Sequence, residues 1–309
     1  MVIGLHSQSL NNSDGFVSGS EITTGYLTKA FLSKAEVEHV FRFSPSNYKM
    51  DSSQEIDLVL IEGWHPEVPY FVSEIRRLYP KAKIIFWNLS FYGFIGVLRL
   101  DVDGYLSNSK KNTVILNKIK PTKFVMLAAD IIDIQNNEFQ IKRTKDVVYL
   151  GLNHTQKSED LEKLILHEAK SFDFSIYGTG WGNHISLSPY WKGILPVNEI
   201  NTLYSSSHVV LGMTEDRQRR SGMINNRVFE ALSCGACFIS EYFSELENVF
   251  GDLIFYSREK GDTKSTIEMI LQDSERMINH RKKTMSFIKE NHTYNHRVDD
   301  ILSFYYSLL

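Results

Sequence analysis

The residues best suited to chemistry lie in one stretch, Ser221 to Ser240, where a glycine loop leads into a helix-like run. Arg227 and Glu230 stand three positions apart in that run. Free backbone amides at a helix start bind phosphate groups, and an arginine adds charge-assisted hydrogen bonds. A glutamate one turn further on can accept hydrogen bonds from a ribose diol. The stretch therefore predicts a sugar-nucleotide site formed by Gly222, Met223, Asn226, Arg227 and Glu230.

A purely structural helix is the alternative interpretation of the same stretch. Glu230 would then only cap the helix or pair with Arg227 at the i, i+3 spacing. Apolar packing is already supplied by Val228, Phe229, Ala231 and Leu232. Ligands of open α/β sheets bind beyond the carboxyl ends of the strands, where this loop falls. We therefore favour the interpretation as a sugar-nucleotide site, here called the donor site.

The elements that position this loop alternate between apolar strand-like runs and helix-like runs, which predicts parallel βαβ units. The expected strands are 2–5, 37–43, 56–61, 83–87, 104–107, 124–127, 147–150, 174–177, 209–213 and 237–240. The expected helices include 21–35, 68–78, 159–172, 199–205, 263–292 and 294–305. A polar segment at 133–146 reads as a linker. We predict an α/β protein with Rossmann-like domains at 1–140 and 141–290 and a final helix within 291–309.

Composition limits the class of protein. The chain has 309 residues, 42% of them hydrophobic and 23% charged, with a net charge of −3. This is typical of a globular protein and does not indicate a nucleic-acid partner. Two cysteines suit a reducing compartment. Because no run approaches the roughly 20 apolar residues of a membrane span and no signal-peptide pattern opens the chain, we expect a cytoplasmic location.

The order Asn-x-Arg-x-Phe-Glu-Ala-Leu-x-Cys-Gly, from Asn225 to Gly235, resembles the donor-site helix of GT-B glycosyltransferases. It is most similar to the branch that includes bacterial spore-maturation glycosyltransferase-like proteins. The upstream segments Tyr177 to Trp181 and Trp191 to Pro196 follow the order found in that family. The resemblance implies two Rossmann-like domains facing across a cleft, with a C-terminal helix that crosses back to the first domain.

The resemblance also implies further contacts to the donor. The nucleobase would be held by backbone groups at Gly193, Ile194 and Leu195, and Gly178 belongs to the same upstream motif. Lys157 is the nearest candidate for the basic residue that reaches the diphosphate in many relatives. The run Arg217, Arg219 and Arg220 either neutralises the leaving diphosphate or is a solvated surface run; Arg220 is the donor-site candidate.

The first half carries weaker candidates. Gly19 and Ser20 resemble the glycine loop that many GT-B enzymes bring near the donor phosphate and the acceptor; alternatively, Ser20 is only a helix cap. Glu62 and His65 follow a buried strand and are the candidate catalytic bases, because an inverting enzyme needs a base there. A loop histidine before Pro66 is the simpler reading of His65.

Three further patterns were considered: a pair of glutamates, a pair of cysteines and an aromatic segment. Retaining relatives carry two glutamates eight positions apart, but eight residues before Glu230 stands Gly222, so retention and inversion both stay open. Cys234 and Cys237 form a single C-x-x-C, too few ligands for structural zinc, and we expect no metal site and no cofactor. The aromatic segment from Phe86 to Leu98 is a core strand with a packed loop, an acceptor pocket or a lipid contact.

These observations predict a metal-independent glycosyltransferase that moves a hexose-type sugar from a nucleoside diphosphate, UDP- or GDP-linked, to an unidentified acceptor. The acceptor is a saccharide, a protein or a lipid-linked molecule, and peripheral membrane contact stays open, as does the oligomeric state. A bacterial glycan pathway would use such an enzyme. Two alternatives remain: a non-catalytic glycan-binding or assembly protein on a degenerate GT-B scaffold, and a nucleotide-sugar epimerase.

Overall fold

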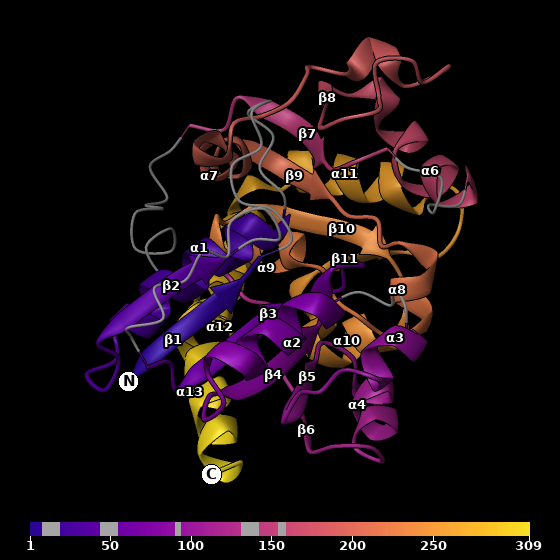
Figure 1. Cartoon of the computed structure of the whole chain (residues 1–309). Coiled ribbons are helices and arrows are strands. Elements are labelled where there is room, and N and C mark those ends of the chain that lie inside the picture. The colour runs from indigo at the N-terminus through magenta and orange to yellow at the C-terminus, as the bar shows by residue number, and fades with distance from the viewer. Residues whose placement is uncertain (8–18, 44–54, 90–93, 131–141, 154–158) are drawn as a thin grey trace. The chain divides into compact units, whose positions relative to one another are not determined.

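The computed structural model describes residues 1–7, 19–43, 55–89, 94–130, 142–153 and 159–309 (Figure 1). The chain divides into two compact units. Unit 1 comprises Met1–Met126 and Tyr294–Leu309, and unit 2 comprises Leu127–Thr293. Each unit contains one sheet of parallel strands, and helices connect the strands except between those on either side of residues 44–54, which lie outside the described ranges; the predicted α/β class with two Rossmann-like domains is confirmed.

The sheet of unit 1 has six parallel strands in the order β2-β1-β3-β4-β5-β6. The strands are β1 (Val2–His6), β2 (His39–Phe43), β3 (Leu58–Glu62), β4 (Lys83–Asn88), β5 (Gly104–Ser107) and β6 (Thr122–Phe124). The helices are α1 (Gly19–Leu32), α2 (Val68–Leu78), α3 (Phe94–Leu98), α4 (Lys110–Leu116) and α13 (Tyr294–Ser307). Every residue of β3 is buried, as expected for a central parallel strand covered on both faces.

Helix α2 shows how local sequence sets an element of unit 1. Pro69 stands in its first turn, where a missing amide hydrogen costs nothing. Val68, Phe71, Val72 and Ile75 follow the i, i+3, i+4, i+7 spacing and are all buried. The helix ends before Tyr79, which precedes Pro80. This helix has the bounds that the sequence predicted.

Helix α13 returns the end of the chain to unit 1, as the resemblance implied. It packs on α1, where the rings of Tyr26 and Tyr294 lie 5.4 Å apart and Lys34 pairs with Asp299. The observed divisions fall after Met126 and Thr293, against predicted ones after residues 140 and 290. The first division comes earlier because Ala129 donates its N–H to the carbonyl of His292, 3.0 Å away, within unit 2.

The sheet of unit 2 has five parallel strands in the order β11-β10-β9-β7-β8. They are β7 (Lys145–Leu150), β8 (Phe174–Tyr177), β9 (Ser207–Leu211), β10 (Cys237–Glu241) and β11 (Phe255–Ser257). The α-helices are α6 (Glu159–Ile165), α7 (Ile200–Ser205), α8 (Asp216–Arg220), α9 (Asn226–Ser233), α10 (Ser244–Phe250), α11 (Asp262–Gln272) and α12 (Ser274–Asn291).

Both sheets reverse their order beside the first strand of the unit. In unit 1 the chain leaves β1 to form β2 on one side and then β3 on the other; in unit 2 it does the same with β7, β8 and β9. Such a reversal is a topological switch point, and the crevice beyond the carboxyl ends of its two strands is where open α/β sheets bind ligands. The fold thus predicts one site beyond β1 and β3 and another beyond β7 and β9.

Candidate functional site

The loop between β9 and α9 has the glycine turn that the sequence indicated. Gly222 has a φ of +70°, in the left-handed region that favours glycine. A Cβ atom there would lie 2.5 Å from Cγ of Glu245. Gly222 therefore meets two constraints that another residue would violate, and it turns the chain toward the start of α9.

The side chains of α9 divide between the core and the site. Val228, Phe229, Ala231 and Leu232 are buried in unit 2. The Nδ2 of Asn226 donates to Oε1 of Glu230 at 2.7 Å, and Glu230 is only 9% exposed. One turn of helix thus holds the largely buried Glu230 carboxylate in a fixed orientation.

Arg227 reaches from α9 to the end of β7. Its guanidinium carbon lies 5.0 Å from the ring centre of Tyr149, and a Cβ on Gly151 would lie 2.6 Å from its Nη2. Its Nη1 is shielded from solvent and has no hydrogen-bond partner within the described part of the chain. Buried donors in native proteins are nearly always paired, so an unpaired guanidinium N–H marks a place for an acceptor. Arg227 places this donor at the β7–β9 switch point.

Tyr204 on α7 completes the group around Arg227 and Glu230. Burial raises the pKa of Tyr204; the charge of Glu230 adds to this, and Arg227 opposes it. The phenol is therefore a neutral hydrogen-bonding group beside two charged ones. The sequence assigned no role to Tyr204, because its contact with α9 depends on tertiary packing.

Three glycines bring backbone groups to the same edge of the sheet. Gly178 has a φ of +117°, and a Cβ there would lie 2.3 Å from the carbonyl oxygen of Gly151. The N–H of Gly178 donates to the carbonyl of Gly193 at 2.9 Å, and Trp191 Nε1 donates to the carbonyl of Gly178 at 2.8 Å. Gly193 itself has a φ of +99° and open space around it. The three glycines thus form a strip from β7 to the loop after β8, in which Gly151 and Gly178 allow close packing and Gly193 borders open space.

The remaining donor-site candidates are placed as follows. Ile194 is 49% exposed and Leu195 is half-buried, so the segment after Gly193 is accessible. Met223 is buried, which leaves its backbone rather than its side chain to meet a ligand. Arg220 ends α8 and is exposed. Lys157 lies outside the described residues.

A buried carboxylate that the sequence analysis missed holds the start of the site. Glu241, at the end of β10, accepts from the Thr214 N–H and from Ser240 Oγ, each at 2.8 Å. Burial raises the pKa of Glu241, and these hydrogen bonds oppose the rise. Asn225 Nδ2 lies 3.5 Å from Thr214 Oγ1, and Oδ1 of Asn225 has no partner in the described residues. The chain from β10 through Thr214 thus orients the residue that precedes α9. The sequence did offer a signal for Glu241, since a charged residue directly after an apolar strand often lies at a binding site.

In unit 1 the structure brings the first-half candidates together. Glu62 ends β3 and is 3% exposed. Burial raises the pKa of Glu62 well above its usual value, and a hydrogen bond with Ser20 is the first of the influences that oppose the rise. Ser20 lies in the first turn of α1, which begins at Gly19, so it is not the residue that caps the helix. Oε2 of Glu62 has no partner among the described residues.

Two histidines stand at or just beyond the ends of the neighbouring strands β1 and β3, and the sequence analysis named only one of them. His65 is 41% exposed; its Nδ1 accepts from the Glu67 N–H at 3.3 Å and lies 3.9 Å from the Glu67 carboxylate. His6, at the end of β1, is fully buried against Phe71, with ring centres 4.3 Å apart. Both His6 ring nitrogens lack partners in the described chain, and burial, then the charge of His65, lowers the His6 pKa to about 4.

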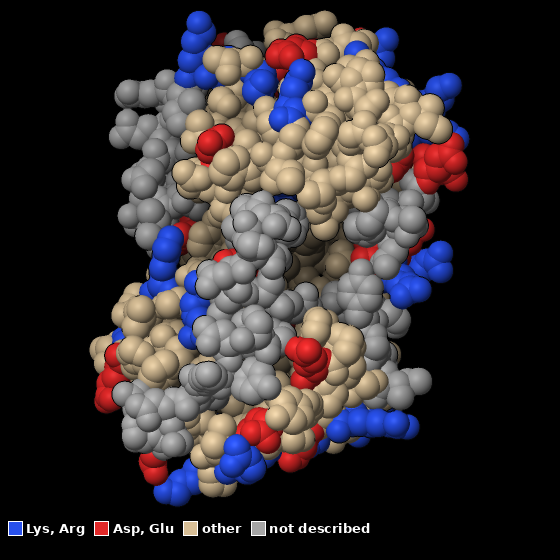
Figure 2. All heavy atoms as spheres, turned by 45° about the horizontal axis from the view of Figure 1, so that its top comes forward, with Lys and Arg blue, Asp and Glu red and all other residues tan. Residues whose placement is uncertain are grey.

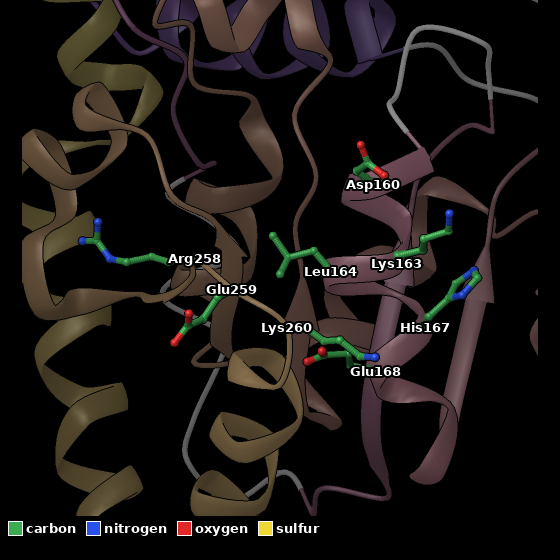
Figure 3. A pocket seen from close by; sticks show the side chains of 8 residues that line it. All are labelled: Asp160, Lys163, Leu164, His167, Glu168, Arg258, Glu259 and Lys260. Carbon is green, nitrogen blue, oxygen red and sulfur yellow. The ribbon is translucent and has the colours of Figure 1, made fainter.

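A separate cavity of about 600 Å³ lies between α6 and the loop that follows β11 (Figure 3). Figure 3 shows Arg258 and Glu259 pointing away from Lys163 and His167. Lys163 pairs with Glu159 at 2.8 Å, and Arg258 pairs with Glu247 at 3.1 Å. Lys163 and Arg258 are thus paired within the fold, and no predicted donor residue from the described part of the chain lines the cavity.

Several other expectations have structural outcomes. Phe86 and Trp87 are fully buried, so the core-strand reading of their segment is correct and the lipid-contact reading is wrong for both; residues 90–93 lie outside the description. Cys234 and Cys237 are buried free thiols. In the described ranges, no cluster of three or more histidine, cysteine, aspartate or glutamate side chains is arranged to hold a metal ion.

The surface charge and the length of the helices were also considered. Basic and acidic side chains are interspersed over the face shown in Figure 2. None of the helices in the described part of the chain is both long enough and apolar enough to cross a membrane.

Two parallel α/β units with a glycine-lined, arginine-bearing switch point define the GT-B class of glycosyltransferase fold, and comparison with known proteins agrees. Residues 157–303 match the family described as glycosyl transferase-like. T4 phage BGT, solved with its UDP-glucose substrate, is 14% identical, with 100% of this chain and 99% of that chain covered at a TM-score of 0.68. The predicted resemblance to GT-B glycosyltransferases is confirmed, and the chain is a transferase-class enzyme.

Two other solved structures share the fold. AviGT4, a glycosyltransferase involved in avilamycin A biosynthesis, is 12% identical, with coverage of 99% of this chain and 97% of that one and a TM-score of 0.67. HepE from Anabaena, solved with UDP and glucose, is 12% identical, with coverage of 98% and 99% and a TM-score of 0.63. No curated protein sequence matches the chain.

Proposed function

We propose that the protein transfers a hexose-type sugar from a nucleoside diphosphate to an acceptor, with the donor bound at the β7–β9 switch point of unit 2. The observation that carries the proposal is the unpaired, shielded Nη1 of Arg227 beside the glycine strip of Gly151, Gly178 and Gly193. An arginine donor next to accessible backbone suits a diphosphate, whose oxygens accept several hydrogen bonds in a small space.

Each residue of the proposed sugar-nucleotide site has a role. Arg227 binds the diphosphate, with the amides after Gly222 and the guanidinium of Arg220 as further donors. Glu230, oriented by Asn226, accepts from the ribose hydroxyls. Gly193, Ile194 and Leu195 present backbone groups to the base, and their accessibility supports this role. Stabilising the charge that develops on the leaving diphosphate is the main chemical task of these residues.

The identity of the donor follows from the relatives only as a proposal. T4 phage BGT was solved with UDP-glucose and HepE with UDP and glucose. We take UDP-glucose as the first donor to test. A bacterial glycan is the product class that we propose, and the acceptor class is unassigned.

We further propose that no metal ion is needed. Arg227 supplies positive charge where a metal would otherwise neutralise the diphosphate. T4 phage BGT was also solved with UDP and Mn²⁺, so the point calls for a direct test. UDP binding measured in EDTA and in Mn²⁺ should give the same dissociation constant; a tenfold gain in Mn²⁺ would contradict metal independence.

For the acceptor side we propose distinct roles for Glu62 and His65. The raised pKa of Glu62 favours its neutral form, so it suits hydrogen-bond donation better than proton removal. His65 is half-exposed. Its Nδ1 accepts from the Glu67 N–H, which puts the proton of the neutral ring on Nε2, so Nε2 serves as the general base only when that proton moves to Nδ1, which lies 3.9 Å from the Glu67 carboxylate. The partner that the sequence did not reveal for His65 is therefore Glu67, two residues away.

The decisive experiment is calorimetric titration with UDP, GDP, CDP and dTDP. One nucleotide should bind with micromolar affinity, and Glu230→Gln should weaken it roughly tenfold through loss of a charge-assisted hydrogen bond. Glu275→Gln, an exposed change on α12, is the matched control and should bind as the wild type does. Absence of binding by all four nucleotides would refute the donor site and favour a degenerate, non-catalytic scaffold.

A further inference from the structure

The outward side of α4 is a surface of unit 1 that the proposed reaction does not use. Val114 is 65% exposed, Ile115 is 44% exposed, and Ile119 in the following turn is 46% exposed. The inward side carries Asn112 and Leu116, both buried. Single exposed apolar residues are ordinary, but three large aliphatic side chains within six residues call for an explanation.

The backbone places these side chains together. Winding continues past the end of α4, since Asn117 N donates to Thr113 O and Ile119 N donates to Leu116 O, each at 2.9 Å. Residues four apart therefore lie in rows along the helix. One row holds Lys110, Val114 and Lys118, and the next holds Lys111, Ile115 and Ile119. We call these six residues the α4 surface.

Every charged side chain in the sequence segment that carries the α4 surface is a lysine. Residues 104–129 contain five lysines and neither aspartate nor glutamate, although the whole chain has a net charge of −3. Lys123 pairs with Asp300 at 2.9 Å, and Lys120 donates to the Val102 carbonyl at 2.6 Å, so these two are used within unit 1. Lys110, Lys111 and Lys118 of the α4 surface are exposed, and Nζ of Lys110 lies 5.6 Å from the ring centre of Phe124.

We propose that the α4 surface docks the protein on a lipid bilayer that contains anionic headgroups. Lysines beside a bilayer gain from the negative surface potential, and aliphatic side chains gain by entering the boundary between headgroups and acyl chains. Stable peripheral attachment needs two such signals together, and the α4 surface carries both. A nucleic acid would satisfy the lysines but would leave Val114, Ile115 and Ile119 without an apolar partner.

Vesicle co-sedimentation of the full chain tests this docking. Vesicles of phosphatidylcholine with phosphatidylglycerol should bind the protein, and vesicles of phosphatidylcholine alone should not. Lys110→Gln, Lys111→Gln and Lys118→Gln combined should lower binding at least roughly tenfold. Ile115→Ser with Ile119→Ser should also lower it, and raising the salt concentration should weaken the lysine contribution.

Ile185→Ser is the matched control, because Ile185 is fully exposed in unit 2 and no lysine occurs between residues 171 and 191. Circular dichroism and UDP titration of each variant show that its fold is intact, which separates this test from that of the donor site. Equal binding to both vesicle types, or unchanged binding by both α4 variants, would overturn the proposal. Binding to a DNA duplex instead of vesicles, or self-association that the α4 variants abolish, would overturn it as well.

Discussion

The two units share a strand order but differ in what they place at the switch point. In unit 2 the switch point carries a guanidinium hydrogen-bond donor, Nη1 of Arg227, beside closely packed glycines and the open space at Gly193. In unit 1 the ends of β1 and β3 carry His6 and Glu62, both buried and both shifted toward their neutral forms. The same topology thus fixes where a ligand can bind, while the residues at the strand ends decide which charge it can have.

The contrast has a simple physical basis. A diphosphate carries charge that must be matched by charge or by many amides, which explains glycine and arginine in unit 2. A sugar or other hydroxyl-bearing acceptor offers neutral donors and acceptors, which buried neutral side chains can match at small desolvation cost. Substituting the strand-end residues of one unit at a time tests whether the two units differ in this way.

The largest expected effect is the acid sensitivity of unit 1. The His6 pKa is about 4 in the folded chain, against 6.5 for an ordinary histidine, so the unfolded state binds the proton more readily. Stability is intact above pH 6.5 and falls as the pH drops toward 4, by up to roughly 3 kcal/mol. His6→Leu removes the proton-binding group and should flatten this loss. Hydrogen exchange of β1 and β3 peptides at pH 7 and pH 4.5 measures it.

Unit 2 gives the internal control for that measurement. Peptides from β7 and β9 should show the same exchange in wild type and His6→Leu at both pH values. An unchanged acid response of β1 and β3 in His6→Leu would show that another group titrates there.

The next largest effect is expected from removing the Arg227 guanidinium, the charged hydrogen-bond donor of unit 2. Arg227→Met keeps an unbranched, apolar stem but deletes the guanidinium, and should weaken UDP binding by about 2 kcal/mol, roughly thirtyfold. Arg227→Lys should recover only part of the loss, since an ammonium group cannot bond a diphosphate through two parallel donors. Calorimetry gives both constants. Arg276→Met, an exposed change on α12, should leave binding intact; equal affinity of Arg227→Met would remove the basis of the donor site.

A smaller effect of opposite sign is expected for Glu62. Folding favours the neutral carboxyl group, because burial raises the Glu62 pKa. The stability of unit 1 is therefore fully present below pH 4.5, the ordinary pKa of a glutamate, and is lost as the pH rises through the folded pKa. Glu62→Gln keeps the shape and cannot ionise, so it should stabilise unit 1 at pH 8 by roughly 1–2 kcal/mol. Urea denaturation at pH 5 and pH 8 should show a gain only at the higher pH. A loss at pH 8 would mean that the carboxylate is ionised and paired.

Local sequence was enough for most of the fold. The predicted ranges of α2, β5 and β8 agree with the structure, because burial periodicity and flanking breakers act within a few residues. The predicted helix at 263–292 is instead two helices, since the Asp273 side chain accepts from the Arg276 N–H at 3.1 Å and starts α12. Strand β11, three residues long, is too short to show a pattern.

The candidate site was predicted only where one segment carries it. The Gly222 turn and the α9 side chains follow from a single stretch of sequence. The contact of Arg227 with Tyr149 joins residues far apart in the chain, and the burial of His6 depends on Phe71 of α2. No pattern in the sequence of β1 distinguishes a buried, unpaired histidine from a solvated one.

The finest test separates backbone strain from ligand contact within unit 2. Gly193 and Gly261 both have a φ of +99° with no atom within 4 Å of a Cβ, so alanine at either position is strained by the backbone alone. Gly193→Ala and Gly261→Ala should each lower stability by about 1 kcal/mol. Only Gly193→Ala should also weaken UDP binding, by severalfold, because its methyl group enters the space proposed for the base. Urea denaturation and calorimetry of the two variants measure both quantities. Equal UDP affinities in the two variants would move the base away from Gly193 and reduce the glycine strip to a feature of the fold.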